Sequence, residues 1–297
     1  MSDFWNGHHR VKSEGDTLFR GDLKPLPRPE CFPSVAEAVE ALFEVGYVVF
    51  PGTLNSIEVA ELRRRMDAMG SPNEEDYVVP GWCYNKQVGS DFSQNPDLLD
   101  YIDRPGVIEV IQAIHSGEPH LGVNPGAQVI GGSSWITGEG RAMGIHTDYQ
   151  SYSLPPEIHA QYRLPIYATT LHYYLNELTL AHGPTVLIPG SHKAGRHPVN
   201  ESAWNGIEPL AGLMKAGDAI LFRNDLWHGA AKNTHPTERR YMMQVHYAHG
   251  SFGKCYPSLR WPQLYHPAVL SKLTSRQRTL LGGREKSCKF ASGYLSY

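Results

Sequence analysis

The sequence predicts a mainly β protein in which helices precede a many-stranded antiparallel sandwich or barrel. Three observations predict this fold class. Apolar residues recur at helical spacing from about residue 34 to 116, and short β-rich runs separated by Gly, Pro, Asn and Asp follow Gly122. The spacing of these runs leaves little room for crossover helices, which disfavours a doubly wound parallel sheet.

Two capping patterns set the start of the first helices. Ser34 and Glu37 form a capping box ahead of apolar residues at helical spacing, and Asn55 and Glu58 repeat the arrangement. Glycines follow both apolar stripes and favour helix ends there. The predicted helices cover residues 34–46, 55–70 and 107–115, with a short strand at residues 47–50 between the first two.

The second half of the chain supplies the predicted β core. The predicted strands are Ala127–Ile130, Trp135–Thr137, Ile166–Leu175, Thr185–Ile188, Asp218–Arg223 and Tyr241–Ala248, and a closing helix covers about Ala268–Leu281. No internal repeat or linker divides the chain. We therefore expect one domain over residues 1–297, with helical support to about residue 120, the β core over about 121–250 and a C-terminal lid and helix over about 251–297.

Composition excludes several classes of protein. The 297 residues are 41% hydrophobic, and 27 Lys and Arg against 30 Asp and Glu give a net charge of -3, unlike the basic surface of a nucleic-acid binder. No apolar run approaches the roughly 20 residues that cross a bilayer. The first 16 residues lack the apolar segment of a secretory signal, and the four cysteines show no C-x-x-C pairing. We expect a cytoplasmic protein with no membrane and no nucleic-acid partner.

The triplet His146-Thr147-Asp148 is the first candidate metal site. Alternate residues of an extended strand point to the same side, so His146 and Asp148 can converge on one ion. The triplet alone is weak, because a strand end with a solvated aspartate has the same pattern. His228 follows another strand-like run and would complete a facial set of two histidines and one carboxylate.

Arg239 is the candidate anion-binding residue. On the last predicted strand it shares one face with Tyr241, Met243 and Val245, whereas Arg240, Met242, Gln244 and His246 share the other. If the Arg239 face points into a barrel, a buried guanidinium lies there, and leaving it unpaired costs about 3–5 kcal/mol. The carboxylate of a bound organic acid fits its planar fork. Arg240 is then expected at the surface or in an interface, and His246 in a structural role.

These residues together resemble one known family. The set His146-x-Asp148, His228 and Arg239, with the run Gly183-Pro184-Thr185-Val186-Leu187-Ile188-Pro189-Gly190-Ser191-His192, is similar to the phytanoyl-CoA dioxygenase family of Fe(II)- and 2-oxoglutarate-dependent oxygenases. The resemblance spans roughly residues 34–246. It implies a double-stranded β-helix, a cupin-like jelly roll, with N-terminal helices and a C-terminal helix.

The resemblance also implies roles for individual residues. His146, Asp148 and His228 would bind Fe(II), and Arg239 would hold the distal carboxylate of the cosubstrate 2-oxoglutarate. Thr185 would donate its hydroxyl to the same molecule, Gln128 is a weaker cosubstrate or substrate contact, and Lys86 and Gln87 are lid candidates. With O2, such a site releases succinate and CO2 and oxidises a C–H bond. Hydroxylation, desaturation and ring formation stay open, whereas a carboxylate at Asp148 leaves no position for a halide ligand.

The substrate side of the site is the least defined. Tyr149 and Gln150 follow Asp148 directly and, with Trp135, are the candidate substrate contacts. The expected substrate is a small metabolite, for example in natural-product biosynthesis, and residues 251–266 are a candidate lid or homodimer contact. Two alternatives stay open: a metal-binding cupin that does not use 2-oxoglutarate, and a non-catalytic sensor or binding module.

Overall fold

The N-terminal helices begin at the predicted capping residues. The computed structural model describes residues 23–68, 86–87, 96–115, 126–140, 142–148, 155–199, 201–250 and 271–281. Helix α1 (Val35–Glu44) follows Ser34, whose hydroxyl accepts the Glu37 N–H while the Glu37 carboxylate accepts the Ser34 N–H at 2.8 Å. At α2 (Ser56–Ala68), the Asn55 side chain accepts two first-turn N–H groups, at 2.9 and 3.0 Å. Both caps confirm the sequence prediction, and each contributes about 1 kcal/mol.

A six-stranded sheet forms the centre of the protein. Its strand order is β2-β9-β6-β11-β4-β3, and every neighbouring pair is antiparallel. Its strands are β2 (Tyr47–Phe50), β3 (Lys86–Gln87), β4 (Ala127–Thr137), β6 (Ala168–Tyr174), β9 (Ala219–Arg223) and β11 (Arg240–His249). The two runs predicted at residues 127–130 and 135–137 are one strand, because all of β4 pairs with β11 through the intervening glycines.

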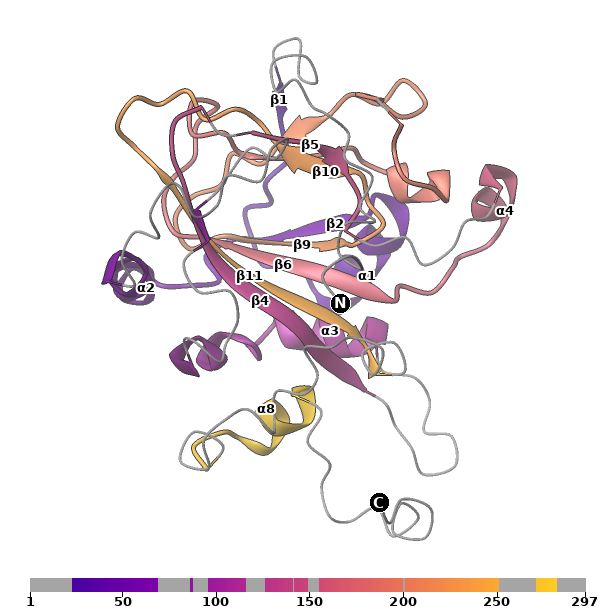
Figure 1. The fold of residues 1–297 in the computed structure, drawn as a ribbon. Helices are drawn as coiled ribbons and strands as arrows, with labels where there is room; N and C mark the ends of the chain where they lie inside the picture. Colours follow the sequence, from indigo (N-terminus) through magenta and orange to yellow (C-terminus); the bar gives the residue numbers. More distant parts are fainter. Residues whose placement is uncertain are drawn as a thin grey trace, which may run out of the picture.

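A smaller five-stranded sheet faces the first one. Its order is β1-β8-β7-β10-β5, with β1 and β8 parallel and the other pairs antiparallel. In Figure 1, β5 and β10 lie above the larger sheet, and α3 lies below it. The strands are β1 (Lys24–Pro25), β5 (Met143–His146), β7 (Thr185–Leu187), β8 (Leu210–Ala211) and β10 (His228–Ala230). The predicted mainly β fold with flanking helices is confirmed, and it consists of two facing sheets.

The two faces of the larger sheet pack against different elements. Leu171 and Tyr173 of β6 and Met243 and Val245 of β11 pack with residues of the helices in the largest apolar cluster. The opposite face contributes Tyr174 and other side chains to a second cluster shared with the smaller sheet. Because side chains alternate along a strand, every second residue of β6 and β11 therefore points between the two sheets.

The remaining elements are short. Helix α3 (Val107–His115) matches its prediction, and the other segments are α4 (Pro156–Gln161), α8 (Ser275–Leu280) and 3-10 turns at Pro96–Tyr101 and Ser191–Ala194. The predicted closing helix at 268–281 is represented by α8, which Thr274 caps, while residues 268–270 lie outside the described ranges. Within those ranges, no helix combines the length and the apolarity that a bilayer-spanning segment needs.

Candidate active site

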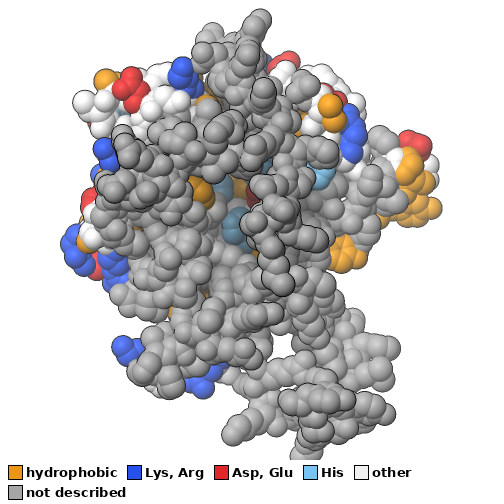
Figure 2. Space-filling model, viewed as in Figure 1, with side chains coloured by type: hydrophobic (Ala, Val, Ile, Leu, Met, Phe, Trp, Pro, Cys, Tyr) orange, Lys and Arg blue, Asp and Glu red, His pale blue; other side chains and the backbone are white. Residues whose placement is uncertain are grey.

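Two histidines meet across neighbouring strands of the smaller sheet. His146 is the last residue of β5 and His228 is the first of β10, and the antiparallel register places them directly opposite each other. Their ring centroids are 4.3 Å apart. The side chain of His228 is 6% exposed and that of His146 is 30% exposed, so His228 is buried and His146 is partly accessible to solvent. Figure 2 shows histidine side chains near the centre of the face that is viewed as in Figure 1.

The hydrogen bonds of these histidines prepare both rings for a metal ion. His146 Nδ1 lies 2.8 Å from the carbonyl of Gly144, and His228 Nδ1 lies 2.8 Å from the carbonyl of Leu226. A carbonyl only accepts, so each Nδ1 carries a proton, and in the neutral ring Nε2 is the atom with the lone pair that a metal ion would bind. This arrangement is typical of metal-ligating histidines.

Asp148 supplies the third ligand atom. Its Oδ1 lies 3.6 Å from His146 Nε2 and 3.4 Å from His228 Nε2, and the three ligand atoms lie within 4.8 Å of one another. Burial favours a higher pKa for Asp148, but the charge of His228 and hydrogen bonds with both histidines hold the pKa well below its usual range. Two imidazole nitrogens and one ionised carboxylate this close together fit a facial iron site.

The prediction that Arg239 points into the barrel is wrong. Arg239 precedes β11 and is exposed, whereas Arg240, the first residue of the strand, is 1% exposed. The face that carries Tyr241, Met243 and Val245 packs against helices, so the residues that point between the sheets are those at even positions. Arg240 therefore occupies the interior position that the sequence assigned to its neighbour.

Arg240 is a buried cation without a carboxylate partner in the described part of the chain. Its Nη1 donates to the Gly183 carbonyl, its Nη2 lies 3.3 Å from Thr137 Oγ1, and its buried Nε has no hydrogen-bond partner among the described residues. Burial lowers the pKa of Arg240 to about 10, because desolvation disfavours the charged form. A guanidinium in this position is suited to bind an anionic ligand.

A pair of hydroxyl groups lies beside this cation. Tyr174 donates its hydroxyl to Thr185 Oγ1 at 2.8 Å, and both side chains are buried. Burial raises the pKa of Tyr174 to about 12, although the hydrogen bond with Thr185 and the charge of Arg240 oppose the rise. Because Thr185 Oγ1 accepts from Tyr174, its own proton remains available to an acceptor such as a carboxylate.

The interior face of strand β6 extends from the proposed metal ligands to the region of Arg240. Its interior residues are Thr170, whose hydroxyl lies 3.1 Å from Asp148 Oδ2, then His172, and then Tyr174. Burial lowers the pKa of His172 well below its usual value, and the charges of both His228 and Arg240 lower it further. At about 3.3 Å per residue, Thr170 and Tyr174 are separated by roughly 13 Å along the strand.

The other predicted contacts fall in three groups. Trp135 of β4 packs against the cluster between the sheets and donates from Nε1 to Ser133 at 2.7 Å, so it lines this interior. Gln128 pairs with Ala248 near the start of β4 and is half-buried, without a contact to the metal ligands among the described residues. Tyr149, Gln150 and residues 251–266 lie outside the described ranges, and the lid candidates Lys86 and Gln87 form the edge strand β3.

The sequence reasoning missed several interior residues. Arg240, Thr170, His172, Tyr174 and His246 all occur at alternate positions of predicted strands. The sequence does contain a pattern that could have identified them, because one face of β6 and β11 is polar while the opposite face is apolar. It indicates a polar interior between the sheets and an apolar face against the helices.

A second group of potential ligands does not have the same chemistry. His182 Nε2 lies 2.7 Å and His235 Nε2 lies 3.8 Å from Glu238 Oε2. However, backbone N–H groups donate to Nδ1 of both rings, from Thr179 at 3.1 Å and from Glu238 at 2.9 Å. Each neutral ring then carries its proton on Nε2, which points a donor and not a lone pair at the carboxylate. The cluster is a hydrogen-bonded contact between two loops.

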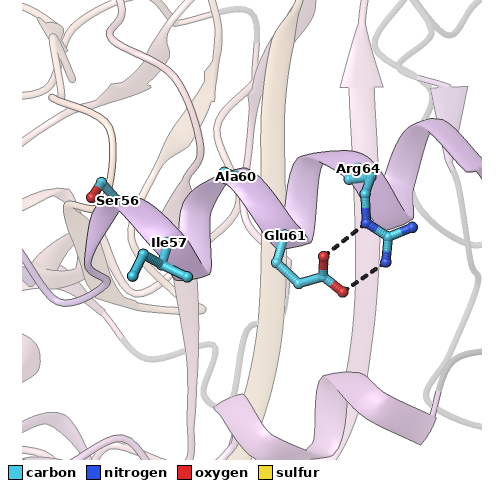
Figure 3. Close-up of a pocket in the computed structure, with 5 residues that line it drawn as sticks. All are labelled: Ser56, Ile57, Ala60, Glu61 and Arg64. Atoms are coloured by element: carbon cyan, nitrogen blue, oxygen red, sulfur yellow. Dashed lines mark hydrogen bonds and ion pairs between the residues drawn. The ribbon is translucent and has the colours of Figure 1, made fainter.

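The exposed side of α2 forms a shallow pocket that is separate from these residues. It is lined by Ser56, Ile57, Ala60, Glu61 and Arg64 (Figure 3). Its two charged residues, Glu61 and Arg64, pair with each other through two hydrogen bonds of 2.8 Å. Their pairing leaves the pocket no uncompensated charge, in contrast to the interior around Arg240.

Comparisons with known sequences agree with the geometry. Residues 129–241 match the family model "Phytanoyl-CoA dioxygenase (PhyH)", and this segment contains His146, Asp148, Thr185, His228 and Arg240. The chain is similar to Dioxygenase ALT11 from Alternaria alternata, with 28% identity over 273 residues that cover 84% of this chain and 82% of that protein.

Solved structures share the fold. The structure of HygX from Streptomyces hygroscopicus with nickel, 2-oxoglutarate and hygromycin B bound has a TM-score of 0.54 at 16% identity, covering 71% of this chain and 86% of that one. The 2-oxoglutarate-dependent epimerase SnoN from nogalamycin biosynthesis has a TM-score of 0.53 at 17% identity, covering 72% and 81%. Residues 129–241 thus match the phytanoyl-CoA dioxygenase family, and together these similarities support an Fe(II)- and 2-oxoglutarate-dependent oxygenase.

Proposed function

We propose that this dioxygenase holds Fe(II) with His146, Asp148 and His228, anchors 2-oxoglutarate with Arg240, and oxidises a C–H bond of a small metabolite. The observation that carries the proposal is the buried Arg240 guanidinium, which has an unpartnered Nε and no carboxylate among the described residues. The prepared Nε2 lone pairs of the two histidines support the metal assignment.

The residues between the sheets fit a dicarboxylic keto acid. Arg240 and the Thr185 hydroxyl would hold the distal carboxylate, and Tyr174 would orient Thr185 through its own hydroxyl. The metal ligands lie at the other end of the β6 interior face, so the cosubstrate would lie along His172. With iron, 2-oxoglutarate and O2 bound, the site supplies oxidation of a C–H bond coupled to release of succinate and CO2.

The neutral state of His172 suits this position. A charged imidazole beside the metal would repel the cation, whereas burial lowers the pKa of His172 well below its usual value and keeps this ring uncharged. Its ring packs edge-on against Phe222, with centroids 5.0 Å apart, and Phe222 packs against His228 at 4.7 Å. These aromatic contacts limit the movement of the His228 ring.

Natural-product biosynthesis is the proposed setting. The similar folds described above include a structure with hygromycin B bound and an enzyme from nogalamycin biosynthesis. Trp135 lines the interior and is the described member of the proposed substrate contacts, with Tyr149 and Gln150 as the others. Hydroxylation, desaturation and ring formation all remain candidate outcomes, and the mass of the product distinguishes hydroxylation, which adds one oxygen atom.

An anaerobic titration tests the proposal. Apoprotein is mixed with Fe(II) and then titrated with 2-oxoglutarate while the visible charge-transfer band of a chelated keto acid is recorded. We expect a band in the wild-type protein and in Arg239→Ala, because Arg239 is exposed. In Arg240→Ala, the concentration of 2-oxoglutarate at half saturation should rise roughly 10- to 100-fold, because hydrogen bonds to a charged group are lost.

The same titration separates the alternatives. Bound iron without a band at any 2-oxoglutarate concentration would favour a metal-binding cupin of another kind. A band without succinate release in the presence of candidate substrates would favour a binding module. An unchanged titration in Arg240→Ala would refute the anchor assignment while leaving the metal site in place.

Three further expectations belong to the whole protein. We propose that residues 1–297 act as one oxygenase domain, that the protein resides in the cytoplasm, and that it binds no nucleic acid. A homodimer through residues 251–266 is the quaternary arrangement to be tested. Sedimentation equilibrium of the full chain and of a variant lacking residues 251–266 gives the oligomeric state directly.

A further inference from the structure

A hydroxyl group on the larger sheet contacts the side of Asp148 that faces away from the two histidines. Asp148 Oδ1 points at the Nε2 atoms, whereas Oδ2 lies 3.1 Å from the hydroxyl of Thr170 on β6. Thr170 is fully buried. The two carboxylate oxygens thus face different partners, one on each sheet.

A third residue sets the direction of this hydrogen bond. His246 of β11 places Nδ1 2.8 Å from Thr170 Oγ1. Because a hydroxyl has one proton and two lone pairs, an N–H from His246 Nδ1 can enter a lone pair while the hydroxyl proton goes elsewhere. The side-chain amide oxygen Oδ1 of Asn224, 3.0 Å away, competes for that proton with Asp148 Oδ2. Charge-assisted hydrogen bonds are roughly twice as strong as neutral ones, so the proton goes to the carboxylate.

We infer that His246 and Thr170 form a relay that orients Asp148 for metal binding, with His246 Nδ1–H donating to Thr170 and the Thr170 hydroxyl donating to Asp148 Oδ2. Thr170 and His246 are positioning residues, because neither would touch the metal. The relay occupies Oδ2, so Asp148 presents Oδ1 alone to the ion and leaves room for the cosubstrate. This inference rests on the proposed metal site.

The relay also joins the two halves of the fold at the metal. Asp148 follows a strand of the smaller sheet, whereas Thr170 and His246 belong to adjacent strands of the larger sheet. Thr170 and His246 are direct neighbours in the register of β6 and β11. Their geometry is therefore fixed by backbone pairing before any ligand binds.

The test measures metal affinity of the apoprotein, with Co(II) as the probe. Isothermal titration gives the Kd, and the visible d–d spectrum reports the ligand set. Loss of an outer hydrogen bond to a metal ligand typically costs 10- to 100-fold in affinity. We expect this loss and an altered spectrum in Thr170→Val, and a Kd within threefold of wild type in Thr170→Ser, which keeps the hydroxyl.

His246 provides a second, independent pair of variants. Asn has an N–H at about the position of the imidazole Nδ1–H, so His246→Asn should keep affinity near wild type, whereas His246→Leu should lose it. This pair decides the question if Thr170→Val does not fold. Rescue by a donor of different shape is a result that a purely structural role would not give.

Thr169→Val is the matched control. Thr169 is equally buried on the same strand, but its hydroxyl faces α3 and lies 3.0 Å from His115 Nε2. The Thr169→Val variant should have a lower melting temperature than wild type and an unchanged Kd for Co(II). Equal Kd losses in Thr169→Val and Thr170→Val would overturn the relay, as would an unchanged Kd in both Thr170→Val and His246→Leu. If wild-type protein fails to bind Co(II), the metal site itself is refuted, and the relay with it.

Discussion

At the scale of single residues, the hydroxyl pair Tyr174 and Thr185 offers a finer test than Arg240. Each hydroxyl contributes one hydrogen bond, worth about 0.5–1.5 kcal/mol. We expect Thr185→Ala to weaken 2-oxoglutarate binding by about 2- to 10-fold, in the same anaerobic titration. Tyr174→Phe should have a smaller effect, because Thr185 keeps its own proton.

A double-mutant cycle decides whether the pair acts as a unit. If Tyr174 acts only by orienting Thr185, the double variant should bind 2-oxoglutarate no more weakly than Thr185→Ala alone. Additive losses would show that Tyr174 contacts the cosubstrate independently. A wild-type affinity in Thr185→Ala would contradict the assignment of this hydroxyl to the cosubstrate.

The residues of β11 show how much of the site the sequence could predict. The three proposed metal ligands were identified from their order and spacing and from the family resemblance, and the structure brings them together. The strand with its two successive arginines was also found, but the choice between Arg239 and Arg240 depends on which face points inward. An apolar face was assumed to point inward, whereas the apolar face of β11 packs against helices and the interior is polar. Which face of a strand points inward depends on the elements that pack against each face, and the sequence of the strand alone does not identify them.

At the scale of elements, the contact between β5 and β10 fixes the two histidines relative to each other. Gly229 follows His228, and a Cβ at Gly229 would lie 2.6 Å from the carbonyl oxygen of Met143 and 3.0 Å from that of Gly144. Both obstacles are backbone atoms of β5, so they move only if the strands separate. Gly229→Ala should therefore weaken Co(II) binding at least tenfold and lower the melting temperature.

Gly138→Ala is the control for this prediction. Gly138 follows β4, and a Cβ there would meet no atom within 4 Å. This variant should keep both the Kd for Co(II) and the melting temperature of wild type. Wild-type metal affinity in Gly229→Ala would show that β5 and β10 tolerate separation without loss of the site.

A buried aspartate joins the N-terminal segment to the larger sheet. Asp218 accepts from Arg28 at 2.6 and 2.9 Å and from the N–H groups of Gly52 and Lys215, each at 2.9 Å. Burial favours a higher pKa for Asp218, but these hydrogen bonds together lower the pKa below its usual value. Removing the carboxylate should cost about 1–3 kcal/mol of unfolding free energy at pH 7.

The pH dependence follows from the direction of that shift. A carboxyl group with a depressed folded-state pKa stabilises the fold above its unfolded value of about 3.9, and the stabilisation is lost as the pH falls through the folded-state pKa. The difference in urea midpoint between wild type and Asp218→Asn should be largest at pH 7 and should shrink below about pH 4. A constant gap across this range would contradict the linkage.

Helix starts and short strands differ in how well the sequence predicts them. The starts of α1 and α2 were placed correctly, because each depends on a cap and an acidic residue three apart in the chain. The short strands β5 and β10 were not among the predicted strands, although their histidines were noted. Strands of three or four residues carry almost no periodicity, and pairing with distant segments creates them.

At the scale of the whole molecule, the proposed ligands join the two sheets. His146 and His228 lie on the smaller sheet, whereas Arg240 lies on the larger one. A metal ion bound by the histidines and a 2-oxoglutarate molecule that reaches Arg240 would form a connection between the layers. The sequence predicted two β layers, but which strands face each other depends on long-range pairing.

This connection predicts a stepwise thermal stabilisation. A ligand that binds only the folded protein stabilises it by about 2.7 kcal/mol at 100 times its Kd, and each kcal/mol raises the melting temperature by about 2–4 °C in a protein of this class. Under anaerobic conditions, Co(II) alone should raise the melting temperature, and 2-oxoglutarate should raise it further only when the metal is present. Arg240→Ala should keep the metal step and lose the 2-oxoglutarate step at the same ligand concentration, while Arg239→Ala keeps both. If 2-oxoglutarate stabilised Arg240→Ala as strongly as wild type, the cosubstrate would have to bind without joining the two sheets.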